Sequence, residues 1–202
     1  MGSIGAGFSM SLDGYIAGVN DAMERLFAWM FAGNTDVTVT IGEKDLDLKM
    51  GEGSAEMYQE AAQGIGAIIS GRRMFDVAAA WGGKHPLNVP IVVVTHHPPQ
   101  EWLDKPDSPF TFVTDGIASA VATAQTIAGD KGIGVGGANV AQQCLKLGLL
   151  DEIHVDLVPV LLGDGIRLFD HLDAPIELEN TQVLSGTGVT HLTFHVIKSS
   201  TR

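Results

Sequence analysis

Residues Asp130–Ile153 read DKGIGVGGANVAQQCLKLGLLDEI, with five glycines followed by a helical pattern and an acidic turn. The spacing Gly132-x-Gly134-x-x-Gly137 formally matches the GxGxxG dinucleotide fingerprint, but that motif requires a strand before its first glycine. Here the only candidate strand, Ile133–Val135, lies inside the motif. The stretch therefore predicts a short strand, a glycine turn and a helix, and it argues against a Rossmann unit.

The turn itself is Gly136-Gly137, and the helix after it is expected to run over Ala138–Leu147 and to close at Gly148. Consecutive glycines let a ligand approach the backbone, and the free N–H groups and dipole at a helix start favour an anion. A tight turn that holds no ligand is the alternative interpretation. The residues of the turn leave the choice open.

The composition is that of a globular domain, with 202 residues of which 45% are hydrophobic and 18% charged. The net charge of −12 argues against nucleic-acid and membrane-surface roles, because it repels phosphate backbones and anionic lipids. Cys144 is the only cysteine, and the N-terminus lacks a signal-peptide pattern. No apolar run reaches the about 18 residues that span a bilayer. We therefore expect a single-domain, cytoplasmic protein.

Short apolar runs bounded by turn residues predict about eight strands, which alternate with helices through the middle of the chain and dominate its end. This order predicts a three-layer α/β fold with a mostly parallel central sheet and an antiparallel C-terminal edge. A helix is expected over residues 23–33, with Phe31 on its apolar face. The polar segment 34–53 is expected to be a long loop, a lid insertion or an irregular hairpin, and Ser54 to cap the next helix.

Two more predicted strands end in residues suited to an anionic or ribose-bearing ligand. Gly71–Arg73 follows the run AIIS, and two cations at a helix start are unfavourable unless an anion lies there. Thr95–His97 follows the run IVVV; adjacent histidines point to opposite sides and make a poor metal pair, so ligand contact is the better interpretation. Solvated surface arginines are the alternative for the first site. Three such strand ends together predict a cofactor site.

These segments occur in the order typical of the dihydrofolate reductase-like superfamily, which the chain resembles over most of its length. The matching segments are SMSLDGYIAG, AIISGRRMFD, IVVVTHHPP, GVGGANVAQQCL and GLLDEIHVDLVPVLLGDGIRLF. The last is similar to the C-terminal reductase domain of the riboflavin-biosynthesis deaminase–reductase. The resemblance implies a doubly wound fold that binds NADPH and reduces a small heterocycle such as 5-amino-6-(5-phosphoribosylamino)uracil.

The resemblance also implies which residues bind the cofactor. It assigns the pyrophosphate to Gly136, Gly137, Ala138, Asn139 and Val140, and further phosphates to Gly71, Arg72 and Arg73. It places Thr95 and His96 near the adenosine 2′-phosphate, and Ser9, Asp13, Gly14, Tyr15, Ile16 and Ala17 beside the nicotinamide. An arginine beside a 2′-phosphate favours NADPH over NADH.

The substrate-facing residues depart from both branches of the superfamily. Leu26 stands where dihydrofolate reductases carry an acid, and Val135 stands where the riboflavin-type domain carries one. Asp156 shares a strand face with His154 and falls where dihydrofolate reductases place a substrate-contacting threonine. It is the candidate catalytic residue, because a carboxylate there would bind the edge of a pyrimidine or pteridine or supply a proton. A structurally paired aspartate is the alternative.

The leading hypothesis is thus an NADPH-dependent reductase of a pyrimidine or pteridine. The alternatives are a dihydrofolate-type reductase, or a non-catalytic nucleotide-binding protein that kept the fold. The superfamily often dimerises, so a homodimer is expected. Structural roles are assigned to Trp29, Trp81, His85, His171, His191 and His195, because the histidines show no metal-ligand spacing and the tryptophans suit core packing.

Overall fold

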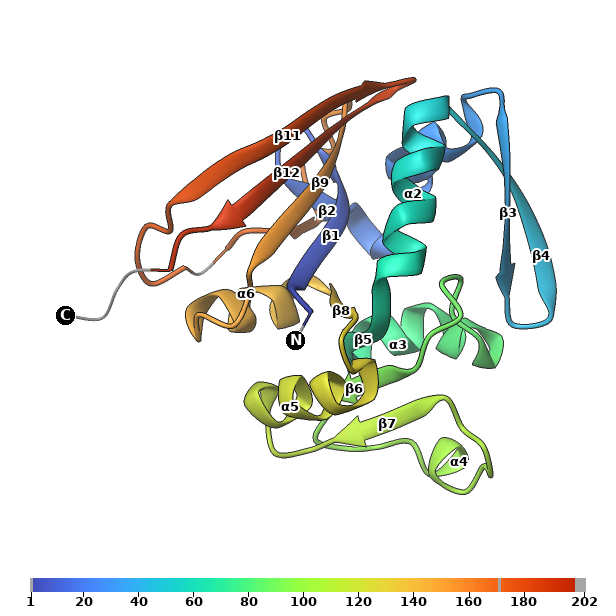
Figure 1. The fold of residues 1–202 in the computed structure, drawn as a ribbon, viewed down its shortest axis with the longest axis vertical. Helices are drawn as coiled ribbons and strands as arrows, with labels where there is room; N and C mark the ends of the chain where they lie inside the picture. The colour runs from blue at the N-terminus through green and yellow to red at the C-terminus, as the bar shows by residue number, and fades with distance from the viewer. Residues whose placement is uncertain (1, 171, 199–202) are drawn as a thin grey trace.

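A computed structural model describes residues 2–170 and 172–198, and its centre is one twisted sheet of eight strands (Figure 1). The strand order is β11-β12-β9-β1-β8-β5-β6-β7, in which β9 to β7 run parallel and β12 and β11 are antiparallel. The expected sheet with its antiparallel C-terminal edge is confirmed. The strand bounds are β1 Ile4–Ser11, β5 Ile65–Gly71, β6 Ile91–Val94, β7 Phe110–Val113, β8 Gly132–Gly136, β9 Glu152–Val158, β11 Leu178–Gly186 and β12 Val189–Val196.

Helices cover both faces of the parallel part of the sheet and give the fold its three layers. Residues alternate between the faces, so Ile69 of β5 joins the core beneath α5 and α6, whereas Ile68 joins the core beneath α3. The helices are α2 Glu52–Gly64, α3 Arg72–Val77, α4 Gln100–Leu103, α5 Ile117–Ala128 and α6 Ala138–Lys146. Within the described ranges, no helix is long and apolar enough to cross a membrane.

The segment between residues 34 and 53 is more regular than the sequence suggested. It is a hairpin of two seven-residue strands, β3 Thr35–Ile41 and β4 Lys44–Met50, paired without a register shift. In Figure 1 this hairpin stands on the far side of α2 from the large sheet. Its outer face is polar, with Thr38 donating a hydrogen bond to Asp47, and this polarity made the segment resemble a loop. A second small sheet pairs β2 Tyr15–Ala17 with β10 Ile166–Arg167.

The expected helix over residues 23–33 is wrong in length and orientation. The chain forms one turn, α1 Glu24–Phe27, followed by a tighter 3-10 turn, η2 Ala28–Phe31. The tighter winding brings Leu26 and Trp29, three residues apart, onto the core side, while Phe31 is 52% exposed. Two further 3-10 turns are η1 Val19–Asp21 and η3 Ala79–Gly83.

The predicted capping role of Ser54 is also wrong. Helix α2 begins at Glu52, and Gly51 occupies the cap position with no side-chain hydrogen bond. The Ser54 hydroxyl instead lies 2.8 Å from Nε2 of His191, on β12. A long-range partner has taken the side chain that the local pattern assigned to the helix end.

Candidate functional site

Three turns lie side by side at the carboxyl edge of the sheet. Strands β8, β5 and β6 are parallel neighbours, with Ser70 in register with Gly136 and Gly71 in register with Val94. The residues that follow them therefore meet at one edge. These are the predicted sets Gly136–Val140, Gly71–Arg73 and Thr95–His96.

Glycines let the starts of α3 and α6 pack closely at this edge. A Cβ on Gly71 would lie 3.1 Å from Cγ2 of Val140, and one on Gly136 would lie 2.8 Å from Sδ of Met74. Gly137 has a φ of +94°, a conformation that disfavours other residues. It precedes the nine-residue helix α6, whose first N–H groups, including that of Asn139, have no intrahelical acceptor. No side-chain cap at Gly137 accepts a hydrogen bond from them.

The two arginines at the start of α3 have carboxylate partners within the chain. Nε of Arg72 lies 2.7 Å from Oδ1 of Asp76, and Nη1 of Arg72 donates to the carbonyl of His97. Nη2 of Arg73 lies 2.8 Å from Oδ1 of Asp21. The chain thus supplies part of the negative charge that the sequence led us to expect, and Arg72 joins α3 to the loop after β6.

The residues of that loop differ in exposure. Thr95 is buried, and its Oγ1 accepts a hydrogen bond of 3.1 Å from the amide of His97. His96 is exposed. Thr95 therefore shapes the loop, and His96 is the member of the pair that is free to meet a ligand.

The loop after β1 is anchored through Asp13. Its carboxylate accepts hydrogen bonds from the Ser11 hydroxyl at 2.6 Å and from the amides of Leu162 and Gly163 at 3.1 and 2.7 Å. The Ser11 hydroxyl, followed by the two amides, lowers the pKa of Asp13 from its ordinary 3.8 to about 2. Asp13 is thus an ionised loop anchor. The rest of the predicted loop set follows it, with Gly14 in the turn (φ +89°) and Tyr15, Ile16 and Ala17 in β2.

The backbone of β1 is uncovered at Gly7, in the interior of the sheet. Gly5, Gly7 and Ser9 share one face of this strand, and Gly7 is exposed although its strand has neighbours on both sides. A Cβ on Gly7 would meet only Cβ of His154, at 3.8 Å. Ala6 pairs with Val135, so this open floor begins next to the Gly136–Val140 turn. Sequence reasoning missed Gly7, although the alternation of small residues along β1 was a visible signal.

Asp156 borders this floor, because its strand β9 pairs with β1 and places it beside Ser9. Its side chain is 23% exposed, and Oδ1 lies 2.7 Å from Nδ1 of His191. The Ser9 hydroxyl is buried and accepts a 3.0 Å hydrogen bond from Nε1 of Trp29. His191, which the sequence assigned a structural role, is the direct partner of the candidate catalytic residue; His171 lies outside the described residues.

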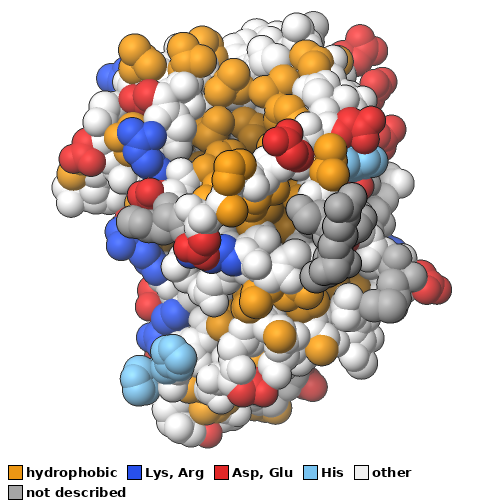
Figure 2. Space-filling view, turned by 90° about the vertical axis from the view of Figure 1, so that its left-hand side faces the viewer, with side chains coloured by type: hydrophobic (Ala, Val, Ile, Leu, Met, Phe, Trp, Pro, Cys, Tyr) orange, Lys and Arg blue, Asp and Glu red, His pale blue; other side chains and the backbone are white. Residues whose placement is uncertain are grey.

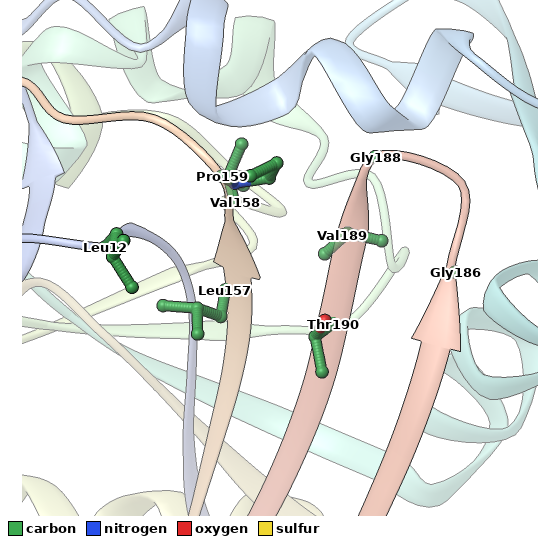
Figure 3. A pocket seen from close by; sticks show the side chains of 8 residues that line it. All are labelled: Leu12, Leu157, Val158, Pro159, Gly186, Gly188, Val189 and Thr190. Atoms are coloured by element: carbon green, nitrogen blue, oxygen red, sulfur yellow. The ribbon is translucent and has the colours of Figure 1, made fainter.

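The other face of the same strands carries an apolar hollow of about 320 Å³. Figure 3 shows its lining, with the Leu157 side chain directed toward Leu12. Thr190 contributes the only polar side chain of the lining, and none of the predicted cofactor residues belongs to it. The hollow is therefore separate from the edge where the three turns meet.

Comparison with known proteins agrees with the architecture. The family model described as RibD C-terminal domain matches residues 3–192. The uncharacterized protein YyaP of Bacillus subtilis (strain 168) is 28% identical over 143 residues, covering 65% of this chain and 74% of YyaP. A putative riboflavin biosynthesis protein from Shewanella sp. PV-4 has a TM-score of 0.73 at 21% identity, covering 98% of this chain and 100% of that one. Dihydrofolate reductase from Enterococcus faecalis, complexed with NADP(H), has a TM-score of 0.57 at 13% identity, with 97% of each chain covered. The fold is dihydrofolate-reductase-like.

Proposed function

The chain belongs to the RibD C-terminal domain family, and we propose that it is an NADPH-dependent reductase that transfers hydride to a C=N or C=O group of a small heterocycle. One observation carries the proposal. Three neighbouring backbone turns suited to phosphates adjoin an uncovered glycine floor that is bordered by Asp156. In open α/β sheets, ligands bind at the carboxyl ends of the strands.

The residues at this edge fit a dinucleotide phosphate. The N–H groups that begin α6, after Gly137, would hold the pyrophosphate, with Gly71 beside them. Arg72, which touches the His97 carbonyl, would meet a 2′-phosphate near His96. When bound, NADPH supplies the hydride; the chain binds and orients the two reactants. The cofactor bound by the Enterococcus faecalis enzyme, which shares this fold, agrees with this assignment.

The floor around Gly7 would take the flat face of the substrate ring, and Asp156 would bind the edge of that ring. A carboxylate accepts two parallel hydrogen bonds from an amino-imino edge, or holds a proton for the reduced atom. We propose a pyrimidine or pteridine, with 5-amino-6-(5-phosphoribosylamino)uracil as the first candidate. The name of the Shewanella protein, a putative riboflavin biosynthesis protein, supports this choice.

Titration of the purified protein with NADPH and NADH, followed by nicotinamide fluorescence, tests the cofactor. We expect NADPH to bind at least about 10-fold more tightly, because a charge-assisted contact to the 2′-phosphate is absent with NADH. Arg72→Ala should remove this preference, whereas Lys49→Ala, which breaks an exposed ion pair on β4, should leave it intact. Absence of binding to either nucleotide would falsify the proposal. The substrate is tested by NADPH oxidation with the pyrimidine candidate and then with dihydrofolate.

A non-catalytic nucleotide-binding protein is the second candidate. It is favoured by Leu26 and Val135, which stand where the two related branches carry acids. It predicts tight NADPH binding without oxidation by any pyrimidine or pteridine. Turnover that Asp156→Asn abolishes would exclude it.

We also propose that the protein is a homodimer joined through the apolar face that holds the hollow. Side chains form rows across β11, β12, β9 and β1, and one row contains Val183, Leu192, Val155 and Phe8. Val183 is 60% exposed and Leu12, beside the rows, is 63% exposed. In Figure 2 hydrophobic side chains gather in a hollow on the side of the molecule that faces the viewer. A second copy would cover this surface.

A further inference from the structure

A chain of polar side chains leads away from Asp156 into the protein. Nδ1 of His191, on β12, lies 2.7 Å from Oδ1 of Asp156. Nε2 of the same ring lies 2.8 Å from the hydroxyl of Ser54, on α2. Ser54 is 1% exposed and His191 2% exposed, so only Asp156 reaches the open side.

The order Ser–His–Asp is that of a hydrolytic triad, but the serine here is closed off. A Cβ on Gly186 would lie 2.6 Å from Oγ of Ser54 and 3.1 Å from Nε2 of His191. The backbone of β11 therefore fills the space that a substrate carbonyl would need. Ser54 therefore cannot act as a nucleophile. Of the three hydrogen-bonded side chains, Asp156 is the one that a substrate can reach.

The hydrogen bonds fix the protons on the imidazole. An ionised carboxylate only accepts, so Nδ1 of His191 donates to Asp156. In the neutral ring Nε2 is then an acceptor, and the Ser54 hydroxyl donates to it. The Asp156 carboxylate thus selects the Nδ1–H tautomer, and Ser54 supports it by donating to Nε2.

Trp29 holds the imidazole from the side. The two rings are 5.2 Å apart at an interplanar angle of 78°, an edge-on contact. Nε1 of Trp29 donates to the hydroxyl of Ser9, the neighbour of Asp156 on β1. The imidazole is thus held by a side-chain contact from η2 and by one hydrogen bond at each nitrogen.

We propose that His191 is a positioning residue, which with Ser54 fixes the orientation in which the Asp156 carboxylate meets the substrate ring. This inference rests on the proposed role of Asp156. It adds that two side chains that do not touch the substrate, His191 and Ser54, set the orientation of the Asp156 carboxylate against the substrate ring. The buried hydroxyl of Ser54 and the partly exposed carboxylate of Asp156 are the two ends of one hydrogen-bonded chain through His191.

A double-mutant cycle tests the inference, with binding of diaminopteridine, a fluorescent ring with an amino-imino edge, as the readout. Asp156→Asn and His191→Leu should each weaken binding at least about 10-fold, the range for a hydrogen bond to a charged group. In the Asp156→Asn background, His191→Leu should cost less than about twofold more, because its effect passes through Asp156. His191→Asn keeps a donor at the Nδ1 position and should stay within about threefold of wild type. His195→Leu, an exposed histidine on the same strand, is the matched control.

The outcomes distinguish a failure of the proposed reductase function from a failure of the proposed role of His191. NADPH binding should be the same in every variant, and its absence in wild type counts against the proposed reductase only. Normal diaminopteridine binding by Asp156→Asn would overturn the role of Asp156 and the inference with it. A His191→Leu defect that persists undiminished in the Asp156→Asn background would show a merely structural histidine and overturn the inference alone.

A second measurement does not depend on ligand binding or on the folding of His191→Leu. The nitrogen chemical shifts of ¹⁵N-labelled histidine distinguish the two tautomers, and His191→Asn identifies the signal of His191. We expect the Nδ1–H tautomer in wild type and in Ser54→Ala, because the Asp156 carboxylate accepts from Nδ1 in both. Asp156→Ala, which lacks that acceptor, should give a mixture of tautomers. An Nε2–H tautomer in wild type, or an unchanged signal in Asp156→Ala, would overturn the arrangement.

Discussion

At the scale of single residues, substitution of Gly7 should affect stability and turnover in opposite directions. A Cβ there meets only His154, at an ordinary contact distance of 3.8 Å. Gly7→Ala should therefore raise the free energy of unfolding by up to about 1 kcal/mol, because alanine restricts the unfolded chain. The same methyl group would lift the substrate ring from the floor and lower turnover by about 10- to 100-fold.

Gly64→Ala is the control for this change. Gly64 ends α2, and a Cβ there has no neighbour within 4 Å. Urea unfolding and NADPH oxidation should show both variants stable and only Gly7→Ala impaired. A fully active Gly7→Ala enzyme would remove the glycine floor from the substrate site.

Asp13 gives the loop after β1 a dependence on pH. Because its pKa falls from 3.8 to about 2 on folding, its ionised form stabilises the protein above pH 3.8, and this contribution disappears as the pH falls through about 2. Asp13→Asn should therefore be less stable than wild type at neutral pH, and the difference should shrink over this window. Denaturant unfolding at a series of pH values measures it. A difference that persists unchanged below pH 2 would mean that the loop depends on the shape of Asp13 and not on its charge.

At the scale of elements, the two ends of α6 provide a matched pair of glycines. Gly137 precedes the helix with a φ of +94°, and Gly148 follows it with a φ of +64°. Neither position has a close clash for a Cβ, so the cost of alanine is backbone strain. This strain is about 1 kcal/mol at Gly148 and larger at Gly137, whose φ of +94° and ψ of 129° lie in a region that only glycine adopts readily. NADPH affinity should fall at least about 10-fold only for Gly137→Ala, because it displaces the N–H groups assigned to the pyrophosphate. Equal losses at both ends would indicate a general effect of strain on the helix.

Elements defined by local pattern were predictable from the sequence. The apolar run IVVV predicts β6, and the turn Gly136-Gly137 predicts the start of α6. Both are local signals, because strand periodicity and turn chemistry are properties of neighbouring residues. The hairpin at residues 35–50 was predicted only as one of three alternatives, although its signal is local. Apolar residues alternate with polar ones over Val37–Ile41 and Leu46–Met50, and the two-residue Gly42-Glu43 turn joins the two strands.

The candidate site was predictable only in part, for the same reason. Its glycine and arginine motifs are local, and their meeting follows from the parallel sheet. The partner of Ser54 is His191, 137 residues away, and no spacing in the sequence connects them. Small residues alternate along β1, but the exposure of Gly7 also depends on which distant elements leave this face of the strand uncovered, and the strand pattern does not contain that information.

At the scale of the whole molecule, the large sheet is covered unequally. Helices pack on both faces of its parallel part, whereas β12 and β11 extend the sheet beyond α6 and leave apolar rows partly exposed. A stable interface buries about 800 Å² of each partner, which several side chains of these rows would have to supply together. The asymmetry therefore points to association through the antiparallel edge.

Substitution at Val183 tests this surface without approaching the proposed cofactor edge. Val183→Glu should convert a dimer into a monomer in sedimentation velocity, because a charge would replace an apolar contact worth about 2 kcal/mol in each subunit. Leu103→Glu, at an equally apolar and 51% exposed position on α4, should leave the dimer intact. NADPH binding should survive in both variants, since Val183 lies on β11, at the opposite end of the sheet from β5 and β6, and Leu103 lies on α4 outside the three turns. A monomeric wild type, or a dimer that Val183→Glu leaves whole, would place any contact between copies elsewhere.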